Sequence, residues 1–225
     1  MTRLTRKAIA GFLNLLAVMA LSLFLPAWTP DFWQAWLFLL SFFGPALAIT
    51  LYLLKHDPGL LQRRVNAGPV AEQRPGQKII QAFAGLFFVL IILIPGFDRR
   101  LHWSAVPPAF SVIADGFVVL GLVMVFLVFR ENSFTSATIE VSDSQRVVTT
   151  GPYAIVRHPM YAGAFVLLLF TPPALGSLWA FTAVVPLLIV IVVRIFDEEK
   201  LLIAQLPGYR EYCREVQWRL VPRLW

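Results

Sequence analysis

Charged side chains are scarce in this sequence. Only 14% of its 225 residues are Asp, Glu, Lys or Arg, whereas 58% are hydrophobic, and the mean hydropathy is +0.72. Soluble domains carry about 25% charged residues and about 45–50% apolar ones. The chain therefore lacks the polar surface that a soluble protein needs, and the composition predicts an integral membrane protein.

Cysteine, histidine and nucleotide-binding loops are also rare. The single cysteine, Cys213, excludes an internal disulfide framework. The three histidines, His56, His102 and His158, lie outside the middle of the apolar runs and form no zinc motif with it. Neither a Gly-x-Gly-x-x-Gly loop nor a Walker loop occurs, which argues against a Rossmann-type domain. The formal charge of +6 comes from scattered residues, so we expect no nucleic-acid partner.

What the sequence does contain is a series of long apolar runs. About 20 apolar residues suffice for a helix to cross the hydrocarbon core of a bilayer. We predict an all-α, polytopic transmembrane helix bundle with about six spans in one domain, 1–225. Residues 1–130 would form a four-span part and residues 131–225 the remainder, in which the fifth and sixth spans make a helical hairpin. The six spans are predicted at Ala8–Leu25, Phe32–Leu54, Ile79–Ile94, Pro108–Phe129, Pro159–Phe170 and Leu178–Phe196.

The polar segments predict the orientation of these spans. Proline and glycine in Lys55–Lys78 preclude one continuous helix there, Arg130–Arg157 is the longest polar segment, and the tail Asp197–Trp225 is predicted to begin as a helix. With the N-terminus inside, only Arg99 and Arg100 of the 19 Lys and Arg residues fall outside. This asymmetry follows the positive-inside rule, so both termini are expected in the cytoplasm.

A first candidate motif precedes the fifth span and reads GPYAIVRHPMYAG at Gly151–Gly163. Pro159 suits the first turn of a helix, where its missing N–H would be unpaired anyway. Free backbone N–H groups would then lie beside Arg157 and His158, and such a helix start attracts a carboxylate or phosphate. The alternative is that Arg157 and His158 only anchor the helix at the membrane surface, with Tyr161 as an interfacial aromatic residue.

A second candidate motif, RIFDEEK at Arg194–Lys200, ends the sixth span with three adjacent acidic residues. Glu198 or Glu199 could hold a cationic group of a ligand, and Arg194 could hold an anionic one. The alternative is that Arg194 and Glu198, four residues apart, simply pair at a solvated helix end.

A third candidate segment is the aromatic and basic tail, with LPGYREY at Leu206–Tyr212. It could fold back as a lid over the other two motifs. It could equally lie in the membrane interface as an amphipathic helix, and the composition does not decide between these.

Together these motifs resemble the isoprenylcysteine carboxyl methyltransferase family, which belongs with the membrane phospholipid methyltransferases. The resemblance rests on Val148–Tyr153, Arg157–Gly163, Arg194–Glu199 and the tail tyrosines Tyr209 and Tyr212. It covers the C-terminal third of the chain, whereas the first 130 residues resemble the family only as generic membrane spans. It implies an S-adenosylmethionine-dependent methyltransferase with its cofactor site at the cytoplasmic face.

The resemblance also implies roles for single residues, which agree with the chemistry of the motifs. Arg194 would hold the methyl acceptor and Glu198 a charged group of the cofactor, and these two are the candidate catalytic residues. The candidate cofactor-binding residues are Gln145, Val148, Tyr153, Arg157, His158, Pro159, Tyr161, Glu198 and Glu199. No metal ligand is predicted.

The identity of the acceptor is less constrained. Carboxyl O-methylation of a prenylated or otherwise lipophilic small molecule entering from the bilayer is preferred, because Arg194 suits an anion. The alternatives are N-methylation of a phospholipid and, in another class, a non-enzymatic membrane scaffold or transporter. The tail reads Pro207-Gly208-Tyr209, tighter than the Phe-Gly-x-x-Tyr form of the eukaryotic enzymes, so a bacterial inner-membrane protein is expected.

Overall fold

The polypeptide folds into a bundle of long helices, seen in a computed structural model that describes residues 2–65, 72, 74–137 and 145–225. The predicted all-α fold class is confirmed, since the described residues form helices and no strand. The elements are α1 (Arg3–Ala27), α2 (Trp33–His56), α3 (Pro58–Val65), α4 (Pro75–Leu101), α5 (Pro108–Glu131), η1 (Gly151–Ala154), α6 (Pro159–Ala174), α7 (Phe181–Gln205) and α8 (Tyr209–Glu215).

The six predicted spans correspond in order to α1, α2, α4, α5, α6 and α7. Within the described residues, α1, α2, α4 and α5 are long and apolar enough to cross a membrane by length and composition. Helix α6 is shorter, with 16 residues, and contains Pro172 and Pro173. These prolines do not end it, because a proline near the end of a helix leaves only the carbonyl four residues earlier without a donor. Helix α7 carries charge at its end and continues to Gln205, as predicted for the start of the tail.

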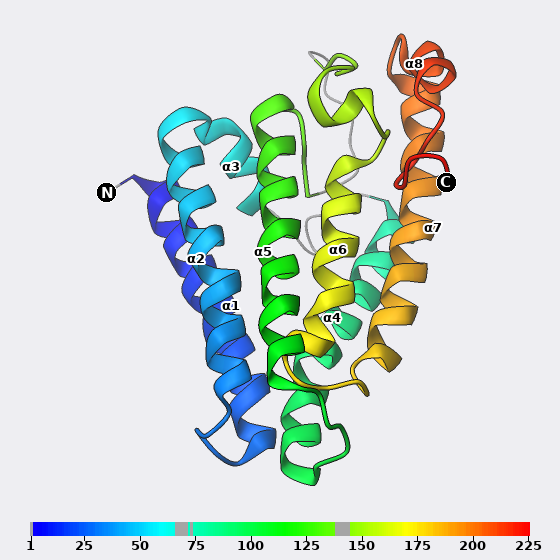
Figure 1. The fold of residues 1–225 in the computed structure, drawn as a ribbon. Helices are drawn as coiled ribbons and strands as arrows, with labels where there is room; N and C mark the ends of the chain where they lie inside the picture. Colours follow the sequence, from blue (N-terminus) through cyan, green and yellow to red (C-terminus); the bar gives the residue numbers. More distant parts are fainter. Residues whose placement is uncertain (1, 66–71, 73, 138–144) are drawn as a thin grey trace.

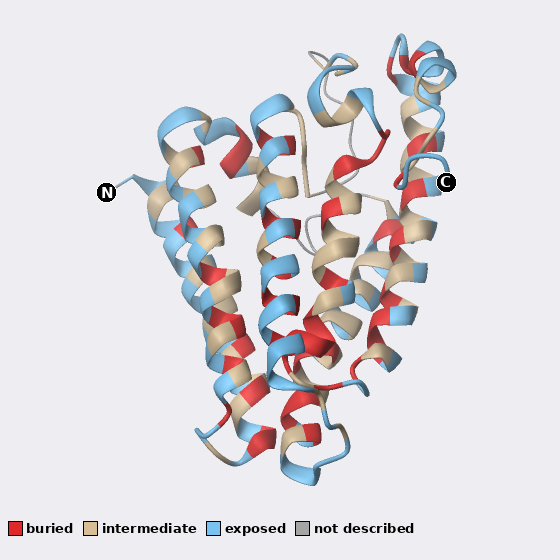
Figure 2. Cartoon of the chain, viewed as in Figure 1, coloured by how far each residue is buried: buried red, intermediate tan, exposed pale blue. Residues whose placement is uncertain are grey.

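The long helices run side by side, and the two chain termini lie toward the same end of the bundle (Figure 1). That end, called the polar end below, also holds α3, η1 and α8. Helix α5 lies between α2 and α6, while α4 packs against both α1 and α7. Buried residues face the middle of the bundle, whereas large apolar side chains such as Leu40 and Ile189 are exposed on its outside (Figure 2). This distribution suits contact with lipid, and the protein is an integral membrane protein.

Helix α3 was not predicted from the sequence. The prolines and glycines of Lys55–Lys78 do break the chain, but between them Leu60 and Leu61 are buried against the bundle. A single turn of apolar contact thus stabilises a short helix in a segment whose composition is polar.

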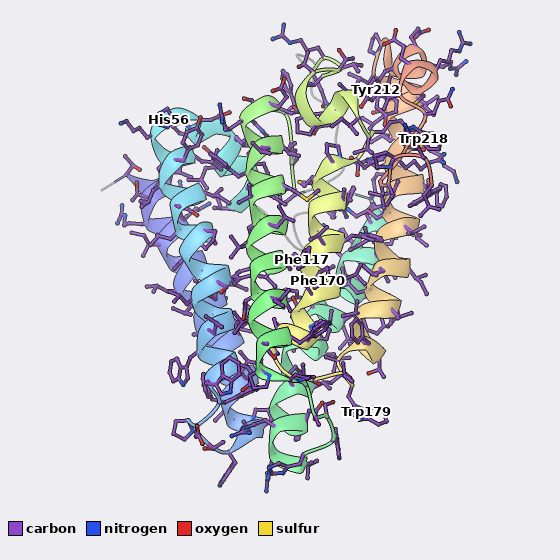
Figure 3. All side chains as sticks on the ribbon, viewed as in Figure 1. His56, Phe117, Phe170, Trp179, Tyr212 and Trp218 are labelled. Carbon is purple, nitrogen blue, oxygen red and sulfur yellow. The ribbon has the colours of Figure 1, made fainter. Side chains whose placement is uncertain are left out.

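Helices α5 and α6 approach each other most closely at two glycines. A β-carbon on Gly121 would lie 2.7 Å from the Gly163 carbonyl oxygen, and one on Gly163 would lie 2.9 Å from the Gly121 carbonyl oxygen. Further along the same interface, Phe117 and Phe170 stack with their ring centroids 4.1 Å apart (Figure 3). Small residues let helix backbones pack closely in membranes, so this crossing fixes the position of α6.

At the end of the bundle opposite the polar end, a buried carboxylate joins α4 to the turn after α6. Asp98 Oδ1 accepts the Ser104 N–H at 2.7 Å, and Oδ2 accepts the hydroxyls of Ser104 at 2.6 Å and Ser177 at 2.5 Å. Three donors thus satisfy a carboxylate that burial would otherwise make costly.

Replacing Asp98 by alanine is expected to lower the free energy of unfolding by about 2–3 kcal/mol, because three donors then lose a charged acceptor. Thermal unfolding in detergent measures this loss. The matched control is Asp31→Ala, since Asp31 is exposed and lies 3.7 Å from Arg99. Equal melting temperatures for the two variants would show that the Asp98 cluster contributes nothing to stability.

Candidate functional site

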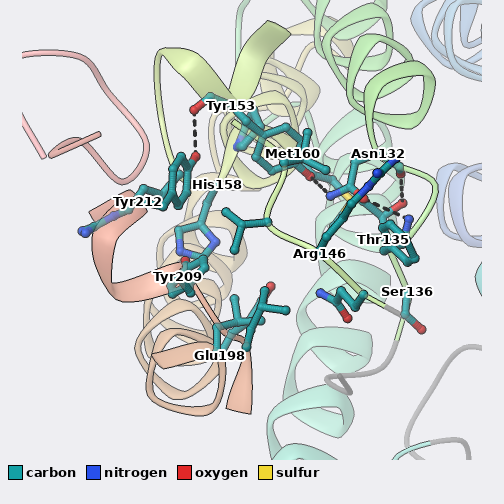
Figure 4. Close-up of a pocket in the computed structure, with 18 of the residues that line it drawn as sticks. Asn132, Thr135, Ser136, Arg146, Tyr153, His158, Met160, Glu198, Tyr209 and Tyr212 are labelled. Atoms are coloured by element: carbon teal, nitrogen blue, oxygen red, sulfur yellow. Dashed lines mark hydrogen bonds between the residues drawn. The ribbon is translucent and has the colours of Figure 1, made fainter. Parts of the chain in front are cut away.

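A cavity opens at the polar end between α6, α7, α8 and the two loops that flank η1 (Figure 4). The residues predicted from the sequence that line it are Gln145, Val148, Tyr153, Arg157, His158, Pro159, Tyr161, Arg194 and Glu198. Three motifs that are distant in the sequence therefore meet around one space.

One side of the cavity is formed by the start of α6. The helix begins at Pro159, as predicted, and His158 occupies its N-cap position without a capping side-chain hydrogen bond. The first-turn N–H groups have no partner within a helix, and the helix dipole makes this end positive. With the guanidinium of Arg157 on the same wall, this side of the cavity suits an anion.

Glu198 supplies an acidic group on another side of the cavity. Its Oε2 atom accepts a hydrogen bond from the Tyr161 hydroxyl at 2.7 Å. The same hydroxyl accepts a hydrogen bond from Arg194 Nε at 3.0 Å. Tyr161 therefore holds a carboxylate and a guanidinium in fixed positions, which suits a ligand that carries both charges.

Arg194 lies in the half of α7 nearer the polar end, and most of its N–H donors already have partners. Its Nη1 atom donates to Gln77 Oε1 at 2.9 Å and lies 3.2 Å from Glu72 Oε1, while Nη2 donates to the Ala137 carbonyl at 2.9 Å. Gln77 is buried and also donates to Asp197 Oδ2 at 2.5 Å. The N-terminal part of the chain thus orients the predicted acceptor-binding residue, a role that sequence reasoning missed because more than a hundred residues separate the partners.

Glu199 does not line the cavity. It is buried behind the cavity wall, where its Oε1 atom lies 3.0 Å from Arg157 Nε and 3.2 Å from His158 Nε2. Its Oε2 atom accepts a hydrogen bond from Arg219 Nε at 2.8 Å. The structure therefore brings Glu199 to the predicted site through other side chains and not through the cavity itself.

The tail folds back over the motifs, which decides between the two alternatives that the sequence left open. The N–H groups of Arg157 and His158 donate to the carbonyls of Trp218 at 2.8 Å and Arg219 at 2.9 Å. The Tyr212 hydroxyl donates to the Tyr153 carbonyl at 2.7 Å, as Figure 4 shows with a dashed line. The tail thus closes one side of the cavity.

Three tyrosines of the cavity keep their protons at neutral pH. Burial raises the pKa of Tyr153 to about 12, and this effect of burial outweighs the opposing hydrogen bond from Asn132. Burial likewise raises the pKa of Tyr209 and of Tyr212 above the ordinary value. These phenols therefore stay neutral and do not act as phenolate bases.

Several cavity residues were not singled out from the sequence. These residues lie outside the motifs recognised in the sequence, and they include Asn132, Phe134, Thr135 and Leu202. The loop after α5 is held in place by α3, because Arg63 donates to the Ser133 carbonyl and Arg64 Nη1 donates to the Ser136 carbonyl at 2.8 Å.

Part of the chain matches a known protein family. Residues 113–204 match the model of the isoprenylcysteine carboxyl methyltransferase (ICMT) family, a segment from the first turns of α5 to the end of α7 that covers less than half of the chain. A search of curated proteins finds no match. The predicted resemblance to this family is confirmed, and with it the assignment as a membrane-embedded methyltransferase.

Proposed function

We propose that the protein uses S-adenosylmethionine to methylate the carboxylate of a lipophilic small molecule that enters the cavity from the bilayer. The observation that carries this proposal is the pairing of a basic and an acidic side in one cavity, at the boundary between the apolar helices and the polar end. The amino-acid part of S-adenosylmethionine carries one charge of each sign and matches that pairing.

The residues present fit the cofactor on both counts. Its carboxylate would bind the side formed by Arg157, His158 and the start of α6, and its ammonium would bind Glu198. Tyr153, together with aliphatic residues of the wall, offers apolar surface for the adenine ring. When bound, S-adenosylmethionine supplies an electrophilic methyl group on a sulfonium sulfur.

Methylation of a carboxylate requires no proton transfer, so the protein contributes mainly by binding, orientation and exclusion of water. The protonated state of Tyr153, Tyr209 and Tyr212 is consistent with a site that holds no phenolate base. Tail closure over Arg157 and His158 shields the same space from water.

Arg194 is the residue that favours an anionic acceptor. It lines the cavity, and its side chain is 12% exposed. A guanidinium binds a carboxylate acceptor more favourably than it binds an amine acceptor. We also propose that the protein lies in a bacterial plasma membrane with both termini in the cytoplasm. The distribution of basic residues along the sequence supports this orientation, as does the position of both termini toward one end of the bundle (Figure 1).

The test is calorimetric titration of the detergent-purified protein with S-adenosylhomocysteine, beside Glu198→Gln. Saturable binding is expected, and the variant should bind about 10–100-fold more weakly, because a charge-assisted hydrogen bond contributes about 1.5–3 kcal/mol. Glu211→Gln is the matched control, since Glu211 is an exposed acid of α8 outside this cavity. A folded wild-type protein that binds no S-adenosylhomocysteine would refute the proposal in favour of a scaffold or transporter.

A further inference from the structure

The arrangement around Glu199 has no role in the proposed function as stated above. This carboxylate lies among three cationic or titratable groups that come from two other segments, Arg157 and His158 before α6 and Arg219 in the tail. The side chains of Glu199, Arg157 and His158 are 7%, 8% and 4% exposed, and that of Arg219 is 29% exposed. Both carboxylate oxygens of Glu199 therefore already contact side chains of this chain.

The backbone connects the same segments a second time. Adjacent N–H groups at Arg157 and His158 donate to adjacent carbonyls at Trp218 and Arg219, near the polar end where Figure 3 labels Trp218. We call the Glu199–Arg219 pair and these two backbone hydrogen bonds the clasp. The clasp joins α7, the start of α6 and the tail, and Arg219 lies outside the segment that matches the family model.

Position separates the members of the clasp into two groups. Arg157 and His158 line the cavity, whereas Glu199 and Arg219 do not. Arg219 is instead held over the rings of Phe196 and Trp225, at 5.2 Å and 5.7 Å from their centroids. An effect of Glu199 or Arg219 on a ligand in the cavity must therefore pass through Arg157 and His158.

We propose that Glu199 is a positioning residue, which uses the clasp to hold Arg157 and His158 toward the carboxylate of the cofactor without touching the cofactor itself. The inference rests on the proposed function and deepens it. A buried carboxylate fixes its partners strongly, because breaking one member leaves an uncompensated charge in a poorly solvated place. The ammonium of the cofactor is then left to Glu198 alone.

The first experiment compares two ligands by calorimetry. S-Adenosylhomocysteine carries the amino-acid part and 5′-methylthioadenosine lacks it. Glu199→Gln and Arg219→Gln are each expected to weaken the binding of S-adenosylhomocysteine about tenfold or more, which is a change of about 1.4 kcal/mol. The affinity for 5′-methylthioadenosine should stay within about twofold of the wild-type value. The double variant should be no weaker than Glu199→Gln, because residues that act through one another are not additive. Arg210→Gln, an exposed tail arginine, is the control and should change neither ligand.

Equal weakening of both ligands would overturn the proposal, since it would indicate a general structural defect. Additive losses in the double variant would also overturn it, because Arg219 would then act independently of Glu199. If Glu199→Gln fails to fold, the partly exposed Arg219→Gln carries the same ligand comparison.

The second experiment needs no ligand and separates this inference from the proposed function. Hydrogen exchange of the apoprotein is followed in peptides that cover 155–162, which contain the clasp N–H groups of Arg157 and His158. Faster exchange there in Glu199→Gln and Arg219→Gln, but not in Arg210→Gln, is expected even if S-adenosylhomocysteine does not bind the wild type. Unchanged exchange in both clasp variants would refute the clasp.

Discussion

Gly121→Val is expected to lower the free energy of unfolding by about 3 kcal/mol. A β-carbon there would lie 2.7 Å from the Gly163 carbonyl oxygen and 2.9 Å from both the Cβ atom and the backbone nitrogen of Leu167. Two of these three contacts are with backbone, so no flexible side chain can move aside. Helices α5 and α6 must separate, and the start of α6 moves away from the cavity.

Gly116→Val is the matched control for this prediction. It lies in the same helix and makes the same change, but a β-carbon there meets no heavy atom within 4 Å. Thermal unfolding in detergent should show a clear fall in melting temperature for Gly121→Val and little change for Gly116→Val. If both variants melt together, the close approach of α5 and α6 is not what limits stability.

The helices could be predicted well because apolar runs mark the segments that meet lipid. The predicted span Pro108–Phe129 became α5 at Pro108–Glu131, and Phe32–Leu54 became α2 at Trp33–His56. The fit is worse for Ile79–Ile94, which lies inside the longer α4 at Pro75–Leu101. Polar residues extend that helix at both ends, Gln77 through its bonds to α7 and Asp98 through the serine cluster. Hydropathy reports the membrane environment, not the length of a helix.

The site was predictable where neighbouring residues act together and not where packing decides. The role of Arg157–Tyr161 could be predicted from local sequence, because a proline at a helix start places the neighbouring polar groups beside free N–H groups. Glu198 and Glu199 show the limit. Adjacent residues on an α-helix point about 100° apart, so only one of the two can face the cavity. Which one does so depends on Tyr161 and Arg219, whose places the sequence does not specify.

Arg194→Gln is expected to lower methyl transfer about 100-fold or more while S-adenosylhomocysteine binding stays within a few-fold of wild type, because a misplaced acceptor alone can cost about that factor. Transfer is measured from labelled S-adenosylmethionine to a farnesylated cysteine with a free carboxylate. Gln77→Leu should lower transfer in the same direction but less, since it removes one of the groups that orient Arg194. Arg74→Gln is the control. Arg74 forms an ion pair with Asp197, but its side chain is 41% exposed, and exposed ion pairs contribute only about 0–1 kcal/mol to stability.

Arg194→Gln is also expected to destabilise the fold. The side chain of Glu72 is 1% exposed, and in this variant its carboxylate no longer has Arg194 as an ion-pair partner. The double variant Glu72→Gln/Arg194→Gln removes that charge, so it should regain thermal stability without regaining transfer. Recovery of transfer in the double variant would mean that Arg194 acts only through stability. An unchanged rate in Arg194→Gln, together with new methylation of phosphatidylethanolamine, would instead assign the site to an amine acceptor, for which a guanidinium in the cavity is no advantage.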